Sequence, residues 1–170
     1  MNPMLPQGFP LPCRVPKDHN GGMSTVFAKI ISGDIPGTFL WADDVCVVFA
    51  TIEPITPGHA LVVPRAEVAQ FTDLPDQTIA HLAVVAKRIG RAQKRAFRAP
   101  RAALIVAGFE VPHTHIHVLP AWDEAALTFA NAHAAPAEEI QSNAQQVRAV
   151  LREVGYGAHV PPDIASSALD

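Results

Sequence analysis

The chain has 170 residues and a formal net charge of −3 at pH 7, with 49% hydrophobic and 17% charged residues, which is typical of a globular domain with a hydrophobic core. The mildly acidic balance argues against a general nucleic-acid binder or membrane-surface protein. No apolar run approaches the roughly 20 residues of a membrane-spanning helix, no signal peptide is evident, and two cysteines exclude a disulfide scaffold, so we expect a cytoplasmic protein.

The N-terminal part of the chain divides into an extension and the start of a folded domain. Residues 1–22 hold five prolines and end in Asn20-Gly21-Gly22, so we expect a flexible N-terminal extension there. A domain over residues 23–136 follows, in which Ser24 can cap a short helix over 25–32. Apolar and β-branched runs bounded by turn residues predict five strands. These runs are 38–42, 45–50, 60–63, 102–107 and 114–119.

Two further helices are predicted between and after these strands. The longer one opens at Pro75-Asp76 and runs to about Phe97, with apolar residues at helical spacing. The other covers residues 137–155, and residues 156–170 indicate a flexible tail. The sum is an α+β domain with a five-stranded antiparallel meander sheet. The long helix is inserted between strands 3 and 4, and helices are packed on one face of the sheet.

The most informative stretch is the run of three histidines at His113, His115 and His117. They alternate with Thr114 and Ile116, which is the period of a β-strand, so the histidines should share one face. Along a strand the outer two would stand roughly 13 Å apart, too far to hold one metal ion without a sharp bend. A metal site built on two of them with a distant ligand stays an alternative. A row of imidazoles along a strand better suits a catalytic site with one nucleophile and a hydrogen-bond donor on either side of it.

Histidine chemistry supports that interpretation. An imidazole with an ordinary pKa near 6.5 is mostly neutral at pH 7. A backbone carbonyl that accepted the Nδ1 proton of such an imidazole would fix the tautomer and leave the Nε2 lone pair free to attack. A protonated neighbour and turn amides near 108–111 could stabilise negative charge that develops on the reacting group.

The run from His113 to Leu119 resembles the motif of the histidine triad (HIT) family, with Thr114 as a mild departure from the usual apolar residue. Three other segments resemble the family in order and spacing. They are 27–36, similar to its first helix; 52–64, similar to its proline loop and third strand; and 108–112, similar to the turn before the triad. Within the family, the chain is most similar to the Hint-like branch.

The resemblance implies nucleotide chemistry: HIT proteins attack the α-phosphorus of a nucleoside phosphoramidate or polyphosphate and form a nucleotidyl-histidine. It implies that His115 is the nucleophile, that His113 and His117 flank the phosphate, and that His59 supports them. It further implies a purine nucleotide substrate and a homodimer, without a cofactor or metal ion. The nucleotide-binding positions that it implies are Thr51, Ile52, Gly108, Phe109, Glu110 and Val111.

Two departures from the family pattern bear on this expectation. Thr51 stands where many Hint-like members carry an aspartate that binds the ribose. Thr25 and Ala28 stand where some members carry a zinc-binding C-x-x-C. The first departure leaves open an alternative, a non-catalytic nucleotide-binding or adaptor protein. The second predicts that the zinc site of those members is absent here.

Overall fold

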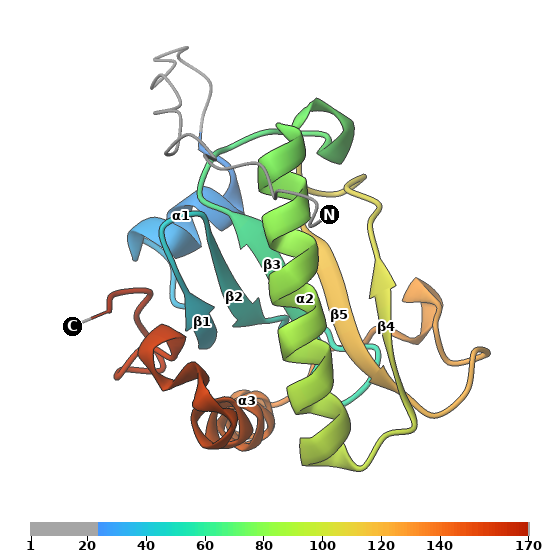
Figure 1. The fold of residues 1–170 in the computed structure, drawn as a ribbon. Coiled ribbons are helices and arrows are strands. Elements are labelled where there is room, and N and C mark those ends of the chain that lie inside the picture. The colour runs from blue at the N-terminus through green and yellow to red at the C-terminus, as the bar shows by residue number, and fades with distance from the viewer. Residues whose placement is uncertain (1–23, 170) are drawn as a thin grey trace, which may run out of the picture.

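The computed structural model describes residues 24–169, which form one sheet with helices on both of its faces (Figure 1). The expected extension over 1–22 lies outside the described residues. The helices and strands in chain order are α1 (Val26–Ser32), β1 (Phe39–Ala42), β2 (Cys46–Ala50), β3 (Ala60–Pro64), α2 (Asp76–Phe97), β4 (Arg101–Ile105), β5 (Ile116–Ala121) and α3 (Ala137–Leu151).

The five strands are antiparallel, as predicted, and α2 lies between β3 and β4 in the chain. The spatial order is β1-β2-β3-β5-β4, so the last two strands depart from the simple meander that the sequence predicted. The reason is the crossover: α2 returns the chain along the sheet, so β4 points the same way as β3. An antiparallel neighbour of β3 must run the other way, and β5 fills that position with Leu61 opposite His117.

Side-chain alternation in the strands divides the core into two layers. Residues such as Val48 and Val62 pack under α2 and α3, whereas the prediction of helices on one face did not include the helix on the other face. Phe49 and Leu61, one position away, point to the other face and pack against Phe27 of α1. The first helix therefore covers the face that also carries His117, opposite α2 in Figure 1.

Two element boundaries differ from the sequence prediction because of local hydrogen bonds. Thr25, not Ser24, caps α1, since its hydroxyl accepts from the backbone N–H of Ala28. The fifth strand begins at Ile116 rather than at Thr114. Both the backbone N–H and the hydroxyl of Thr114 donate to the Val68 carbonyl, so this part of the chain bonds outside the sheet ladder.

Residues 156–169 lie in the stretch that the sequence predicted to be a flexible tail, and they make hydrogen bonds to the sheet and to α1. The Phe39 backbone N–H donates to the carbonyl of Ile164 at the edge of β1. The buried guanidinium of Arg148 donates to the carbonyls of Phe39 and Pro161. Val160, among the first residues of this segment, is buried in the core. Arg148 thus ties α3, β1 and the C-terminal segment together.

No helix among residues 24–169 has both the length and the apolar composition of a bilayer-spanning segment.

We expect Arg148→Met to lower the free energy of unfolding by about 3 kcal/mol, because it leaves the carbonyls of Phe39 and Pro161 without their donors in a buried environment. Urea unfolding measures this change. The matched control is Arg95→Met, which removes an exposed ion pair with Glu153 and should cost less than about 1 kcal/mol. Equal losses in the two variants would contradict the role given to Arg148.

Candidate active site

His115 lies immediately before β5 and is 6% exposed. Its Nδ1 lies 2.7 Å from the backbone carbonyl oxygen of His113, so Nδ1 carries the proton and donates it to that oxygen. Nε2 is then the unprotonated nitrogen with a free lone pair. The side chain lines a cavity on the α1 face of the sheet, in the tautomer that the sequence analysis expected of a nucleophile.

His113 is completely buried and has a different environment from the one expected. Its Nε2 donates to the carbonyl of Pro64 at 2.8 Å, and its Nδ1 lies 2.9 Å from the hydroxyl of Thr25. Because a carbonyl can only accept, Nε2 carries the proton and Nδ1 accepts from Thr25. Both ring nitrogens are therefore bonded to the protein, and His113 does not line the cavity. Its contribution is the carbonyl that orients His115.

His59 and His117 form a second chain of hydrogen bonds. The backbone N–H of Ile55 donates to His59 Nδ1 at 3.1 Å, so the proton of the neutral ring is on Nε2. That Nε2 donates to His117 Nδ1 at 3.0 Å. The proton of neutral His117 is consequently on its own Nε2. The cavity thus contains a lone pair on His115 and an N–H donor on His117, and His59 lies behind the latter.

Burial keeps these imidazoles neutral at ordinary pH. Loss of hydration, followed by the charge of His117, lowers the pKa of His59 from 6.5 to about 3. Burial, followed by the charge of His115, lowers the pKa of His117 to about 4. Burial also lowers the pKa of His113. The tautomers assigned to His59, His113 and His117 therefore hold across the neutral range.

Two phenylalanines fix the rings from outside the histidine motif. The edge of Phe27, from α1, meets His115 with ring centroids 4.9 Å apart. Phe129, in the short 3-10 helix η2 (Phe129–Asn131), meets His117 at 5.0 Å. The rings of His115 and His117 are 4.9 Å apart, so the two face the same part of the cavity. Such edge contacts restrict ring rotation and add to the packing.

The cavity has a volume of about 570 Å³, within the range that holds a small organic ligand. Four of the six predicted nucleotide-binding residues line it together with two histidines. These residues are Thr51, Ile52, Glu110, Val111, His115 and His117. Gly108 and Phe109 do not line it. Gly108 has a φ of +81° in the preceding turn, and the side chain of Phe109 is 98% exposed.

Two helices and the C-terminal segment also line the cavity, which was not predicted from the sequence. Ile30 of α1, Gln141 of α3 and Ala165 line the cavity, although they are far from the triad in sequence. Ala137 and Ile140 also line it, and with Gln141 they occupy one face of a helix, at positions i, i+3 and i+4. That periodicity predicts that the three residues share one face of α3. It does not predict that this face borders a cavity.

The alternative of a metal held by the triad requires His113 and His115 to offer lone pairs to one point. Only Nε2 of His115 is free, because both nitrogens of His113 and Nδ1 of His115 are engaged. Thr25, at a position where some family members carry a zinc-binding cysteine, instead donates a hydrogen bond to His113. The triad geometry therefore disfavours a metal site.

Comparison with models of protein families identifies the family of this chain. Residues 32–124, more than half of the chain, match the model described as the HIT domain. The chain therefore belongs to the histidine triad (HIT) family.

Three relatives illustrate the similarity. An uncharacterised HIT-like protein of Saccharolobus solfataricus is 33% identical over 104 residues, which are 58% of this chain and 75% of that one. An adenosine 5'-monophosphoramidase of Saccharomyces cerevisiae is 33% identical over 100 residues, which are 58% and 63% of the two chains. A zinc-bound histidine triad family protein of Mycobacterium smegmatis has a crystal structure that matches with a TM-score of 0.69 at 30% identity, over 79% of this chain and 98% of that one.

The lowered pKa values predict that stability falls as the pH falls from about 6.5 to 4. In this window the unfolded chain protonates its histidines, whereas folded His59 and His117 resist protonation until about 3 and about 4. The unfolded state then binds more protons, so the free energy of unfolding decreases by at most about 1.4 kcal/mol per pH unit for each histidine. Urea unfolding at several pH values measures the slope.

His59→Gln should make this slope shallower, because the amide keeps an N–H for His117 but cannot titrate. His133→Gln, at an exposed position, is the matched control. A slope in the His59 variant as steep as in the parent protein would show that folded His59 titrates normally.

Proposed function

We propose that this protein is a nucleotide hydrolase or nucleotidyl transferase that attacks the α-phosphate of a purine nucleoside phosphoramidate or polyphosphate through a nucleotidyl-histidine at His115. The single observation that carries the proposal is the hydrogen bond from His115 Nδ1 to the His113 carbonyl, which leaves Nε2 unprotonated towards a ligand-sized cavity. The monophosphoramidase among the relatives favours the phosphoramidate as substrate and the Hint-like branch as its place in the family.

In the first step, Nε2 of His115 forms a bond to phosphorus while the bond from phosphorus to the leaving nitrogen or oxygen breaks. The leaving group takes the electron pair of that bond and gains a proton from solvent water. The imidazole of His115 becomes a cation, and the His113 carbonyl that accepts from Nδ1–H stabilises the new charge. His117 Nε2–H donates to a phosphoryl oxygen, whose charge grows in the transition state. Water then attacks phosphorus while the bond to His115 breaks. The electron pair of that bond returns to Nε2, which makes the ring neutral again, and the proton of the attacking water passes to solvent.

The walls of the cavity fit a nucleoside. Ile30 and Ile140 offer apolar surface from opposite helices, where a purine ring can lie. The hydroxyl of Thr51 and the amide of Gln141 line the same cavity and can bind sugar hydroxyls. Gln141 thereby compensates for the absence of an acidic residue at Thr51. The same departure motivates the second candidate, a nucleotide-binding or adaptor protein without turnover.

We expect His115→Ala to reduce kcat on adenosine phosphoramidates by at least about a thousandfold, because the nucleophile is lost. His133→Ala, at an exposed position, should leave kcat unchanged. Acid-quenched reactions with an α-phosphate-labelled substrate should trap label on the parent protein and not on the His115 variant. Equal hydrolysis by the parent and the His115 variant would refute the proposed mechanism. Calorimetric AMP binding without turnover in the parent would identify the second candidate.

The proposed enzyme is also a homodimer through β4. This strand lies at one edge of the sheet in Figure 1, with the apolar side chains of Leu104 and Val106 52% and 39% exposed. The opposite edge strand, β1, is partly covered because Phe39 bonds to the C-terminal segment. An open edge with apolar side chains favours pairing with a second copy.

Light scattering should give the mass of a dimer at micromolar concentration. Leu104→Arg should give a monomer, because it places like charges opposite each other at the edge. Val154→Arg, at an exposed apolar position outside the sheet, should remain dimeric. A monomeric parent protein would contradict this part of the proposal and leave the chemistry of His115 untouched.

A further inference from the structure

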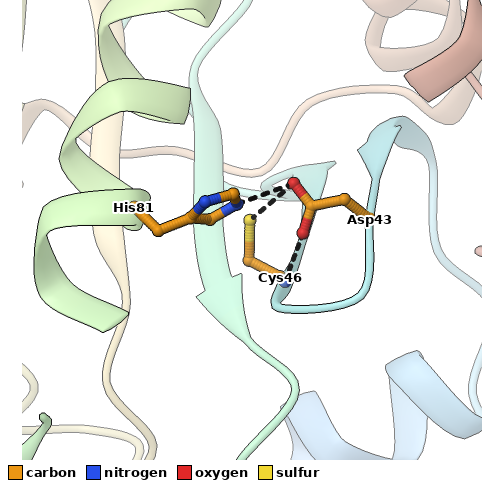
Figure 2. A group of neighbouring side chains, drawn as sticks. All are labelled: Asp43, Cys46 and His81. Atoms are coloured by element: carbon orange, nitrogen blue, oxygen red, sulfur yellow. Dashed lines mark hydrogen bonds and ion pairs between the residues drawn. The ribbon is translucent and has the colours of Figure 1, made fainter. Parts of the chain in front are cut away.

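Three metal-ligating side chains meet on the other face of the sheet, away from the nucleotide cavity. Asp43 lies in the turn between β1 and β2, Cys46 begins β2, and His81 is on the first half of α2. Figure 2 shows the carboxylate, the thiol and the imidazole pointing to one spot between the hairpin and the helix. The carboxylate oxygen, Sγ and a ring nitrogen all lie within 4.8 Å of one another.

The carboxylate of Asp43 is held in place by backbone and indole donors. Its Oδ1 accepts from the backbone N–H groups of Val45 and Cys46, each at 2.8 Å. Its Oδ2 accepts from Trp41 Nε1 at 2.8 Å. These three hydrogen bonds fix the orientation of the carboxylate. Ligating carboxylates in metal sites are oriented by hydrogen bonds of this kind.

The other two groups already lie against the same oxygen. His81 Nε2 is 2.8 Å from Asp43 Oδ2, and Cys46 Sγ is 3.8 Å from it. A tetrahedral zinc ion needs about 3.3 Å between its oxygen and nitrogen ligands and about 3.5 Å between oxygen and sulfur. The present separations differ from these values by about half an ångström or less. The His81 imidazole has to move away from Asp43 Oδ2 by about half an ångström to admit an ion.

We propose that Asp43, Cys46 and His81 form a site for a divalent transition-metal ion, zinc by the chemistry of its ligands. One carboxylate, one thiolate and one neutral imidazole are the mixed oxygen, sulfur and nitrogen set that zinc accepts, whereas magnesium and calcium take oxygen ligands. On binding, the thiol of Cys46 releases its proton. The anionic carboxylate and thiolate then balance the two positive charges of the ion.

The burial of the three residues indicates how the ion would enter and what it would do. Cys46 is fully buried in the core, and the side chain of Asp43 is 11% exposed. The side chain of His81 is 36% exposed, so solvent reaches one side of the site and a water molecule can supply the fourth ligand. An ion there connects the β1–β2 hairpin to α2, and it raises stability by binding the folded state alone.

The site is tested with Co²⁺ added to the full chain, because cobalt reports a thiolate ligand by a charge-transfer band in the near ultraviolet. Cys13, the other cysteine, lies outside the described residues, so all proteins carry Cys13→Ser. We expect one ion per chain, the thiolate band, and competition by Zn²⁺. Cys46→Ser should abolish the band. His81→Gln, which keeps an N–H for Asp43 at a half-exposed position, should weaken binding at least about tenfold.

His133→Gln is the matched control and should bind as the parent protein does. If Cys46→Ser does not fold, the His81 variant alone decides the question. Co²⁺ binding that is unchanged in His81→Gln, or that is abolished by His115→Ala, would place the ion elsewhere and overturn the proposal. The absence of binding at micromolar Co²⁺ and Zn²⁺ would overturn it as well. Apart from Co²⁺ binding that His115→Ala abolishes, none of these outcomes bears on the proposed nucleotide chemistry.

Discussion

The hydrogen bond from the Nδ1 of His115 to the backbone carbonyl of His113 is the constraint on which the site depends. It selects one of two tautomers and aims the remaining lone pair at the cavity. It lies just before β5, which begins only at Ile116 because Thr114 bonds to the Val68 carbonyl outside the sheet ladder. The carbonyl in turn is fixed because the ring of His113 is anchored to Pro64 and Thr25. The hydrogen bond between His115 and His113 thus depends on the segments that contain Thr25, Pro64 and the histidines themselves.

Two sets of hydrogen bonds give His115 and His117 different roles in the site. One runs from Thr25 through His113 and makes His115 an acceptor. The other runs from the Ile55 backbone through His59 and makes His117 a donor. Because burial disfavours the charged forms of His59 and His117, the second set is not disturbed by protonation near neutral pH. Opposite roles for two similar imidazoles therefore come from what lies behind each ring.

Much of this could be predicted from the sequence, for physical reasons. The span of α2, the five strands and the tautomer of His115 follow from periodicity, turn residues and the chemistry of imidazole. The placement of β5 beside β3 could not be deduced, since pairing depends on the direction in which α2 returns the chain. The buried state of His113 also escaped prediction, because its partners Thr25 and Pro64 are 88 and 49 residues away. Alternation places a histidine on a face but does not identify its neighbours there.

The hydrogen bonds of Arg148 to β1 and to the C-terminal segment have a consequence for biosynthesis. The sheet and its histidines are complete in the chain by Ala121, whereas Gln141 and Ala165, which close the cavity, are made later. A nascent chain can therefore fold its strands around the triad while the cavity still lacks a wall. Proteolysis after α3 would remove Ala165 from the cavity wall and the Pro161 carbonyl from Arg148, while the histidines and Gln141 would remain.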